Sequence, residues 1–199
     1  MPWQIQAATA DEWELGWQDY LTSEEIARLP EDYLTLGSNH GTAFHPNLPT
    51  IPYEQVSDHT VVPAICHGRW GYDVFVSREV KSLIEDLEPE IHFFHPIELH
   101  LKSGRVLRDS HFLLRVGSLV EGIVAEESQL KPYVRDGKLR FYRPTTARPR
   151  ITWNANAISG RHLWVDRYFT RAIYCSDQFM EELVNRQIQH FRAIPSSAI

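Results

Sequence analysis

The sequence predicts an α+β fold with a mixed or antiparallel sheet, because short apolar strands alternate with helical periodicity and hairpin turns. Two segments, near 72–99 and 171–195, carry the same pattern: an apolar strand, a serine, an amphipathic stretch and a second apolar strand. A sequence pattern that occurs twice indicates one supersecondary unit used twice. We therefore expect two strand–helix–strand units, preceded by short N-terminal helices.

The chain of 199 residues is long enough for one domain with a sizeable core. We expect an acidic helical N-terminal segment over 1–36, an irregular connector over 37–70, and the repeat-bearing core over 71–199. Asp11 can cap a first short helix, and Thr22-Ser23-Glu24-Glu25 has the pattern of a capping box for a second. The connector is rich in Gly, Pro, Asn and Thr, which favours irregular structure.

Each predicted unit has a serine where the strand ends and the helix begins. Ser77 and Ser176 can each accept a hydrogen bond from an amide of the first helical turn. Neither has the Gly-x-Ser-x-Gly surroundings of a nucleophile elbow, so we interpret both as helix caps. Glu182 and Arg186 form a favourable i, i+4 pair in the second helix. The predicted apolar stripes are Val80, Leu83, Ile84 and Leu87 in the first helix, and Phe179, Met180, Leu183, Val184 and Ile188 in the second.

Between the two units the sequence predicts hairpins. Strands over 91–101 and 105–116 flank Ser103-Gly104. Strands over 133–135 and 138–142 flank Asp136-Gly137, a pair that suits a type I′ turn.

Composition indicates an ordinary globular protein, with 43% hydrophobic and 23% charged residues. The chain has no apolar run long enough to span a bilayer. Its first residues lack both the basic region and the apolar region that a signal peptide has. The two cysteines, Cys66 and Cys175, do not suggest a disulfide framework, and we expect Cys175 to be a buried apolar residue. Together these features predict a cytoplasmic protein with no membrane partner.

Charge is distributed unevenly along the chain. Residues 1–36 hold eight acids and one base, whereas residues 131–171 hold ten bases and two acids. Such asymmetry can steer association with a charged partner. The structural alternative is that both regions are solvated faces, or that they face each other in the folded protein.

Candidate chemistry is sparse. The histidines and cysteines show neither the His-x-x-x-His spacing of a helical zinc site nor a Cys-x-x-Cys pair. The acidic run over 85–90 is explained by a solvated turn, and no triad or phosphate-binding glycine loop is present. We therefore expect no metal, no cofactor and no catalytic residues.

The chain resembles a family of bacterial immunity proteins of polymorphic toxin systems, the eleventh immunity-protein class, formerly a domain of unknown function. The resemblance covers about residues 70–195 and rests on a sequence pattern rather than on an invariant motif. Members commonly end the second helix with a glycine, where this chain has Arg186-Gln187-Ile188-Gln189-His190. The resemblance implies a non-enzymatic protein that binds and neutralises a cognate toxin. The stretches that carry it are Asp73–Ser77 with Phe93–Leu99, Gly160–Arg167, and Ile173–Ser176 with the C-terminal helix.

If the toxin is a nuclease, its substrate groove is expected to be basic, and the acidic N-terminal segment could occupy it. The candidate partner-binding residues are Asp11, Glu12, Trp13, Glu14, Trp17, Asp19, Glu24 and Glu25. One alternative is a nucleic-acid-binding module that uses the Arg- and aromatic-rich stretch 131–171; the sequence pI of about 5.9 argues against it. The other alternative is an enzyme whose active site is not visible in the sequence.

Overall fold

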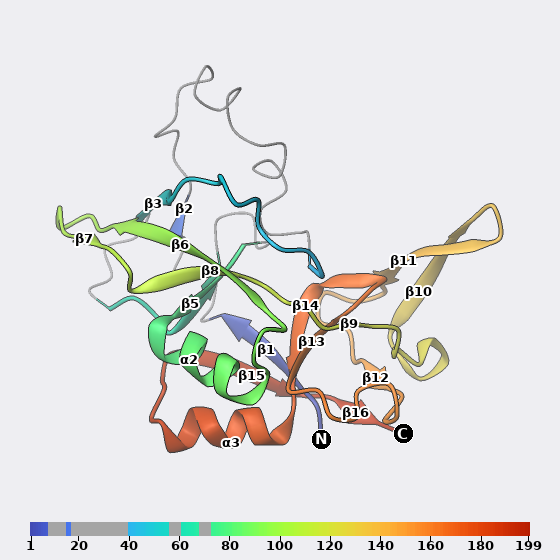
Figure 1. The fold of residues 1–199 in the computed structure, drawn as a ribbon. Helices are drawn as coiled ribbons and strands as arrows, with labels where there is room; N and C mark the ends of the chain where they lie inside the picture. The colour runs from blue at the N-terminus through green and yellow to red at the C-terminus, as the bar shows by residue number, and fades with distance from the viewer. Residues whose placement is uncertain (8–14, 17–39, 56–60, 68–72) are drawn as a thin grey trace.

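The computed structural model describes residues 1–7, 15–16, 40–55, 61–67 and 73–199 (Figure 1). The predicted helices at Asp11 and at Thr22-Ser23-Glu24-Glu25 lie outside the described residues. Within the described part the chain is mostly β, with two α-helices and two mixed sheets. The predicted α+β class is therefore broadly right, and both helices of the repeat pattern are present.

The first sheet is built around the first predicted unit. Its strands lie in the order β2-β3-β6-β8-β5-β4, and β7 pairs with β6. The pair β3–β6 is parallel and the other pairs are antiparallel. The strands are β2 (Leu15–Gly16), β3 (Ile51–Gln55), β4 (Ile65–His67), β5 (Val74–Ser77), β6 (Phe93–His100), β7 (Val106–Leu107) and β8 (His111–Arg115).

The second sheet is built around the second unit. Its order is β15-β1-β14-β13-β9, in which only β13–β9 is parallel. The strands are β1 (Trp3–Ala7), β9 (Leu119–Val120), β13 (Leu163–Asp166), β14 (Phe169–Cys175) and β15 (Phe191–Pro195).

Both predicted strand–helix–strand units are present, as β5-α2-β6 and β14-α3-β15. In each unit the two strands run parallel but are not neighbours, because an antiparallel strand from elsewhere in the chain lies between them. That strand is β8 in the first unit and β1 in the second. The two units thus share a split β-α-β topology, completed by strands that their own sequences do not contain.

Helix α2 spans Arg78–Leu87 and helix α3 spans Asp177–Asn185, and they lie on the same side of the molecule (Figure 1). Both serine caps are confirmed. The Ser77 hydroxyl accepts from the Val80 amide at 3.4 Å, and the Ser176 hydroxyl accepts from the Phe179 amide at 3.1 Å. These bonds satisfy amides that have no partner inside the helix.

The predicted stripe of the first helix is buried at Val80, Leu83 and Ile84. In the second helix the prediction is wrong for Val184, which is 68% exposed, whereas Phe179 and Leu183 are buried. Phe179 and Leu183 are four residues apart and share one face, whereas Val184 lies about 100° further around the helix.

Ion pairs join and support the two helices. The predicted pair of Arg186 with Glu182 forms at 3.5 Å, and the same guanidinium reaches Asp86 of α2 at 2.8 Å. One hydrophobic cluster fills the space beneath the helices and contains residues of both units, among them Ile5, Val80, Leu163 and Phe179. The two sheets therefore share a core.

A second cluster packs aromatic rings beneath the second sheet. Trp153 meets Trp164 and Tyr174 edge to face, with ring centroids 5.7 and 4.7 Å apart, and all three are buried. Strand β12 (Thr152–Trp153) pairs with β16 (Ser197–Ala198) beside it, and the 3-10 helix η2 covers Ala125–Glu127. No helix in the described residues is long and apolar enough to cross a membrane.

Strands β10 (Leu130–Arg135) and β11 (Lys138–Pro144) form a separate two-stranded ribbon that projects from the body (Figure 1). Its turn is the predicted Asp136-Gly137 pair, with φ of 52° and 71°. Positive φ at both central residues is the signature of a type I′ turn, so this prediction is confirmed. We call residues 130–144 the arm.

Candidate functional site

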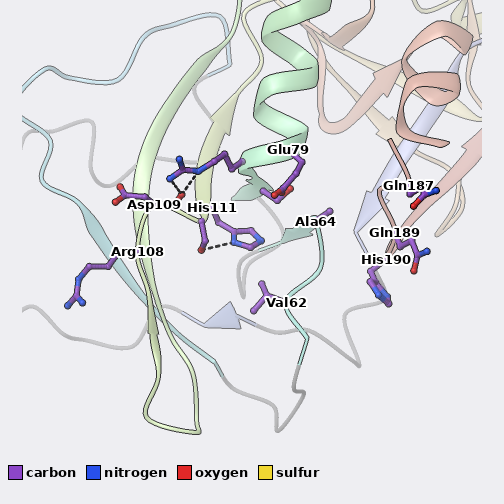
Figure 2. A pocket seen from close by; sticks show the side chains of 12 residues that line it. Val62, Ala64, Glu79, Arg108, Asp109, His111, Gln187, Gln189 and His190 are labelled. Carbon is purple, nitrogen blue, oxygen red and sulfur yellow. Dashed lines mark hydrogen bonds between the residues drawn. The ribbon is translucent and has the colours of Figure 1, made fainter. Parts of the chain in front are cut away.

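An open cleft of about 580 Å³ lies where the two units meet (Figure 2). One wall comes from the start of α2 and the turn before β8, and the opposite wall from the segment after α3. Its lining is mostly polar. The lining residues are Val62, Ala64, Ser77, Arg78, Glu79, Arg108, Asp109, Ser110, His111, Gln187, Gln189 and His190.

Several polar groups on one wall of the cleft are hydrogen-bonded. Arg78 donates to the Asp109 carbonyl through Nε at 3.0 Å and Nη2 at 2.6 Å, and His111 Nδ1 lies 3.1 Å from the Ser110 hydroxyl (Figure 2). His111 Nε2 donates a hydrogen bond to the Pro63 carbonyl at 3.0 Å. Burial lowers the pKa of His111, so the ring is neutral and ties the segment before β4 to β8.

Left-handed backbone is concentrated at this cleft. Asp109, Gln187 and His190 have φ of 55°, 55° and 63°. Gln187 follows Arg186, the C-cap residue of α3: its amide donates to the Val184 carbonyl, and the Ile188 amide donates to the Leu183 carbonyl. This is the Schellman ending, which usually takes a glycine at the left-handed position. Members of the family that the chain resembles commonly have a glycine at this helix end. Here Gln187 adopts the left-handed conformation instead.

A buried carboxylate connects the two units. Glu88 Oε2 accepts from His92 Nε2 and from the Leu163 amide, each at 2.8 Å, and the Gly117 amide donates to His92 Nδ1 at 3.2 Å. Burial raises the pKa of Glu88, but these hydrogen bonds outweigh it and hold that pKa below its usual value. The expectation that the acidic run over 85–90 is a solvated turn is therefore wrong for Glu88, which is buried.

The arm carries exposed aromatic and cationic side chains. Tyr133 and Phe141 stack across the two strands with centroids 4.7 Å apart, and the Arg143 guanidinium lies 4.6 Å from the Tyr133 centroid. Phe141 and Val134 are 40% and 55% exposed. The arm as a whole holds five bases and one acid.

In the structure, the aromatic and basic residues of the stretch 131–171 fall into two groups, one in the body of the protein and one exposed on the arm. Trp153 and Trp164 belong to the buried aromatic cluster, and Arg167 pairs with Glu121 at 2.9 Å on the body. Tyr133, Phe141 and the arm's cations form a separate exposed group. Sequence periodicity could not separate the two kinds, because core and surface aromatics alternate with arginine in the same way.

The candidate partner-binding residues predicted from the sequence all lie outside the described residues. They are Asp11, Glu12, Trp13, Glu14, Trp17, Asp19, Glu24 and Glu25. Their role stays a prediction. The cleft was not predicted as a site, and the arm was considered only as part of the Arg- and aromatic-rich stretch 131–171 of the nucleic-acid alternative. The predicted Asp136-Gly137 turn between basic, aromatic strands was the signal that could have separated the arm from the rest of that stretch.

No cluster of three or more metal-ligating side chains occurs within the described ranges. Cys66 and Cys175 are both buried free thiols, which confirms the interpretation of Cys175 as a core residue. Burial raises the pKa of both thiols, so neither is a thiolate nucleophile near neutral pH. What the described surface offers is a projecting arm and an open polar cleft, features typical of a binding protein.

Comparison with protein-family models identifies which kind of binding protein this is. The model of the immunity protein family Imm11 matches residues 5–195, and the chain belongs to this family. No curated protein matches the chain. The family match extends the resemblance, which covered about residues 70–195, to nearly the whole chain. The protein is thus an immunity protein, which neutralises a toxin by binding and not by catalysis.

Proposed function

We propose that the protein binds its cognate toxin domain one to one in the cytoplasm and blocks the toxin's active site or holds the toxin in an inactive shape. The family match over residues 5–195 carries this proposal.

The test is purification of the tagged protein from its native cells, followed by mass spectrometry of what accompanies it. We expect a stoichiometric toxin domain from a secreted effector. Titration of that purified domain with the immunity protein should then abolish toxin activity at a one-to-one ratio. A toxin that stays active at excess immunity protein would contradict the proposal.

The acidic N-terminal residues are the first proposed contact, through a basic groove on the toxin. Charge reversal of four of them, Asp11, Glu12, Glu24 and Glu25, is expected to slow association at low salt, because complementary charge accelerates encounter. The difference from wild type should disappear at high salt. An association rate unchanged at low salt would exclude these residues from the interface.

A further inference from the structure

The arm, residues 130–144, has the properties of a surface built for a partner. A lone two-stranded ribbon has little stability of its own, yet this one is anchored firmly at its base. Leu130 is buried, the Tyr142 amide donates to the Tyr168 carbonyl at 2.8 Å, and the Thr145 amide donates to the Gln129 carbonyl at 3.0 Å. The type I′ turn fixes the other end. The arm is therefore preorganised, which lowers the entropic cost of binding.

Cationic charge on the arm is poorly compensated. Lys131, Lys138 and Arg143 have no carboxylate partner among the described residues. Arg135 and Arg140 share the single Asp136 at 3.7 and 3.9 Å, with all three side chains about half exposed or more. Such exposed pairs contribute little. The arm thus presents net positive charge, which is complementary to an acidic surface.

Apolar groups lie beside this charge. The stacked Tyr133 and Phe141 with Arg143 combine the residue types that dominate binding energy in protein interfaces. Their rings already face each other, which leaves less ring surface for stacking with nucleic-acid bases. Together with the chain's net charge of -6, this favours a protein partner over nucleic acid.

The edge of β10 is poorly suited to pairing with a further strand, which favours recognition of the arm through its side chains. Pro132 in the middle of β10 has no amide hydrogen to donate, and charged residues flank it on the same strand. Proline and charge are the devices by which proteins discourage the pairing of a further strand. A partner therefore engages the arm's faces.

We propose that the arm docks onto an acidic surface of the cognate toxin domain, with Phe141 as its apolar anchor and the arm's cations as the charged rim. This inference rests on the proposed function, since the partner is the toxin that the protein neutralises. It adds a second contact region, of opposite charge to the N-terminal segment.

Two arm variants test the proposal against the purified toxin domain that accompanies the wild-type protein. Lys138→Glu with Arg140→Glu is expected to slow association about tenfold or more at low ionic strength, with the difference shrinking at high salt. Phe141→Ala is expected to weaken binding on the order of 30-fold, mainly through faster dissociation. Circular dichroism and thermal unfolding check that each variant is folded.

The matched control is Arg105→Glu with Arg161→Glu. It makes the same charge change at two exposed arginines outside the arm. We expect the control to bind at nearly the wild-type rate. Arm variants that bind the toxin as the control does would overturn the proposal and leave the proposed function intact. A wild-type protein that does not bind the toxin would instead overturn the proposed function.

Nucleic acid is tested with a fluorescent single-stranded RNA oligomer in the same buffers. The proposal expects no RNA binding by the wild-type protein at low salt. Binding that is lost in the Lys138→Glu, Arg140→Glu variant, with toxin binding unchanged, would assign the arm to nucleic acid and overturn the proposal.

Discussion

Gln187 holds a left-handed backbone conformation that costs a non-glycine residue about 1–2 kcal/mol. Replacing it with glycine removes that strain and adds some freedom to the unfolded chain. Gln187→Gly is therefore expected to raise the free energy of unfolding by about 0.5–1 kcal/mol, measured by urea denaturation. Gln189→Gly, two residues on and outside the left-handed region, is the control and should destabilise the protein.

Replacing Glu88 is expected to destabilise the protein, since buried hydrogen-bond donors then lose their acceptor. Glu88→Ala leaves the His92 ring and the Leu163 amide without their acceptor. We expect a loss of about 3 kcal/mol in the free energy of unfolding. Glu85→Ala makes the same change at an exposed position of the same acidic run and should cost less than about 1 kcal/mol. Equal effects in urea denaturation would contradict the role given to Glu88.

At the scale of the element, the serine at each strand-to-helix junction is the shared feature of the two units. Ser176 caps α3 and also contacts His162 Nδ1 at 3.0 Å. Ser176→Ala is expected to lower the free energy of unfolding by about 1–2 kcal/mol, and Ser176→Asn to recover part of it. The exposed Ser159→Ala is the control. Thermal unfolding is the measurement, and an unchanged midpoint for Ser176→Ala would contradict the cap.

The elements that could be predicted from sequence are those whose signals are local. The two caps and the Asp136-Gly137 turn depend on residues within a few positions, and all three are confirmed. Glu88 could not be recognised as buried, because its partner Leu163 lies far along the chain. The exposed face of the arm was hidden for a related reason: the exposure of Phe141 depends on where the ribbon projects, which no local pattern encodes.

At the scale of the whole molecule, β1 shows why the strand topology could not be predicted from the sequence. It lies between β14 and β15 and is antiparallel to both, although it begins the chain. The Trp3 indole donates to Asp177 at 2.7 Å and so fixes this strand to the start of α3. The sequence predicted two similar units in a mixed or antiparallel sheet, whereas each unit lies in its own sheet. The strand that completes each unit is set by long-range pairing alone.

Buried histidines make the stability of the whole fold sensitive to acid. Burial, helped by the charge of Arg115, lowers the pKa of His40 to about 4. Its Nδ1 accepts from the Val116 amide at 3.0 Å, a role that only the neutral ring can fill. Burial also lowers the pKa of His95 and of His111, which bond to the carbonyls of Pro49 and Pro63.

Because these pKa values are lower in the folded state, the stabilisation is present above about pH 6.5, the unfolded value, and is lost as pH falls toward 4. His40 alone is expected to cost about 2 kcal/mol at pH 5. The raised pKa of half-buried Asp73 and of buried Asp166 acts in the opposite direction, since these carboxyls take up protons more readily in the folded state. The three histidines nevertheless dominate the pH dependence of the free energy of unfolding just below pH 6.5, because their pKa in the unfolded state is about 6.5.

Urea denaturation at pH 7.5 and pH 5 measures this loss directly. The wild-type protein should be less stable at pH 5 than at pH 7.5 by about 2 kcal/mol, since the two aspartates oppose the further loss from His95 and His111. His40→Gln, whose side-chain oxygen can accept from the Val116 amide, should reduce the pH dependence by about the contribution of His40. Equal pH dependence in the variant and the wild type would show that His40 is not held neutral in the fold.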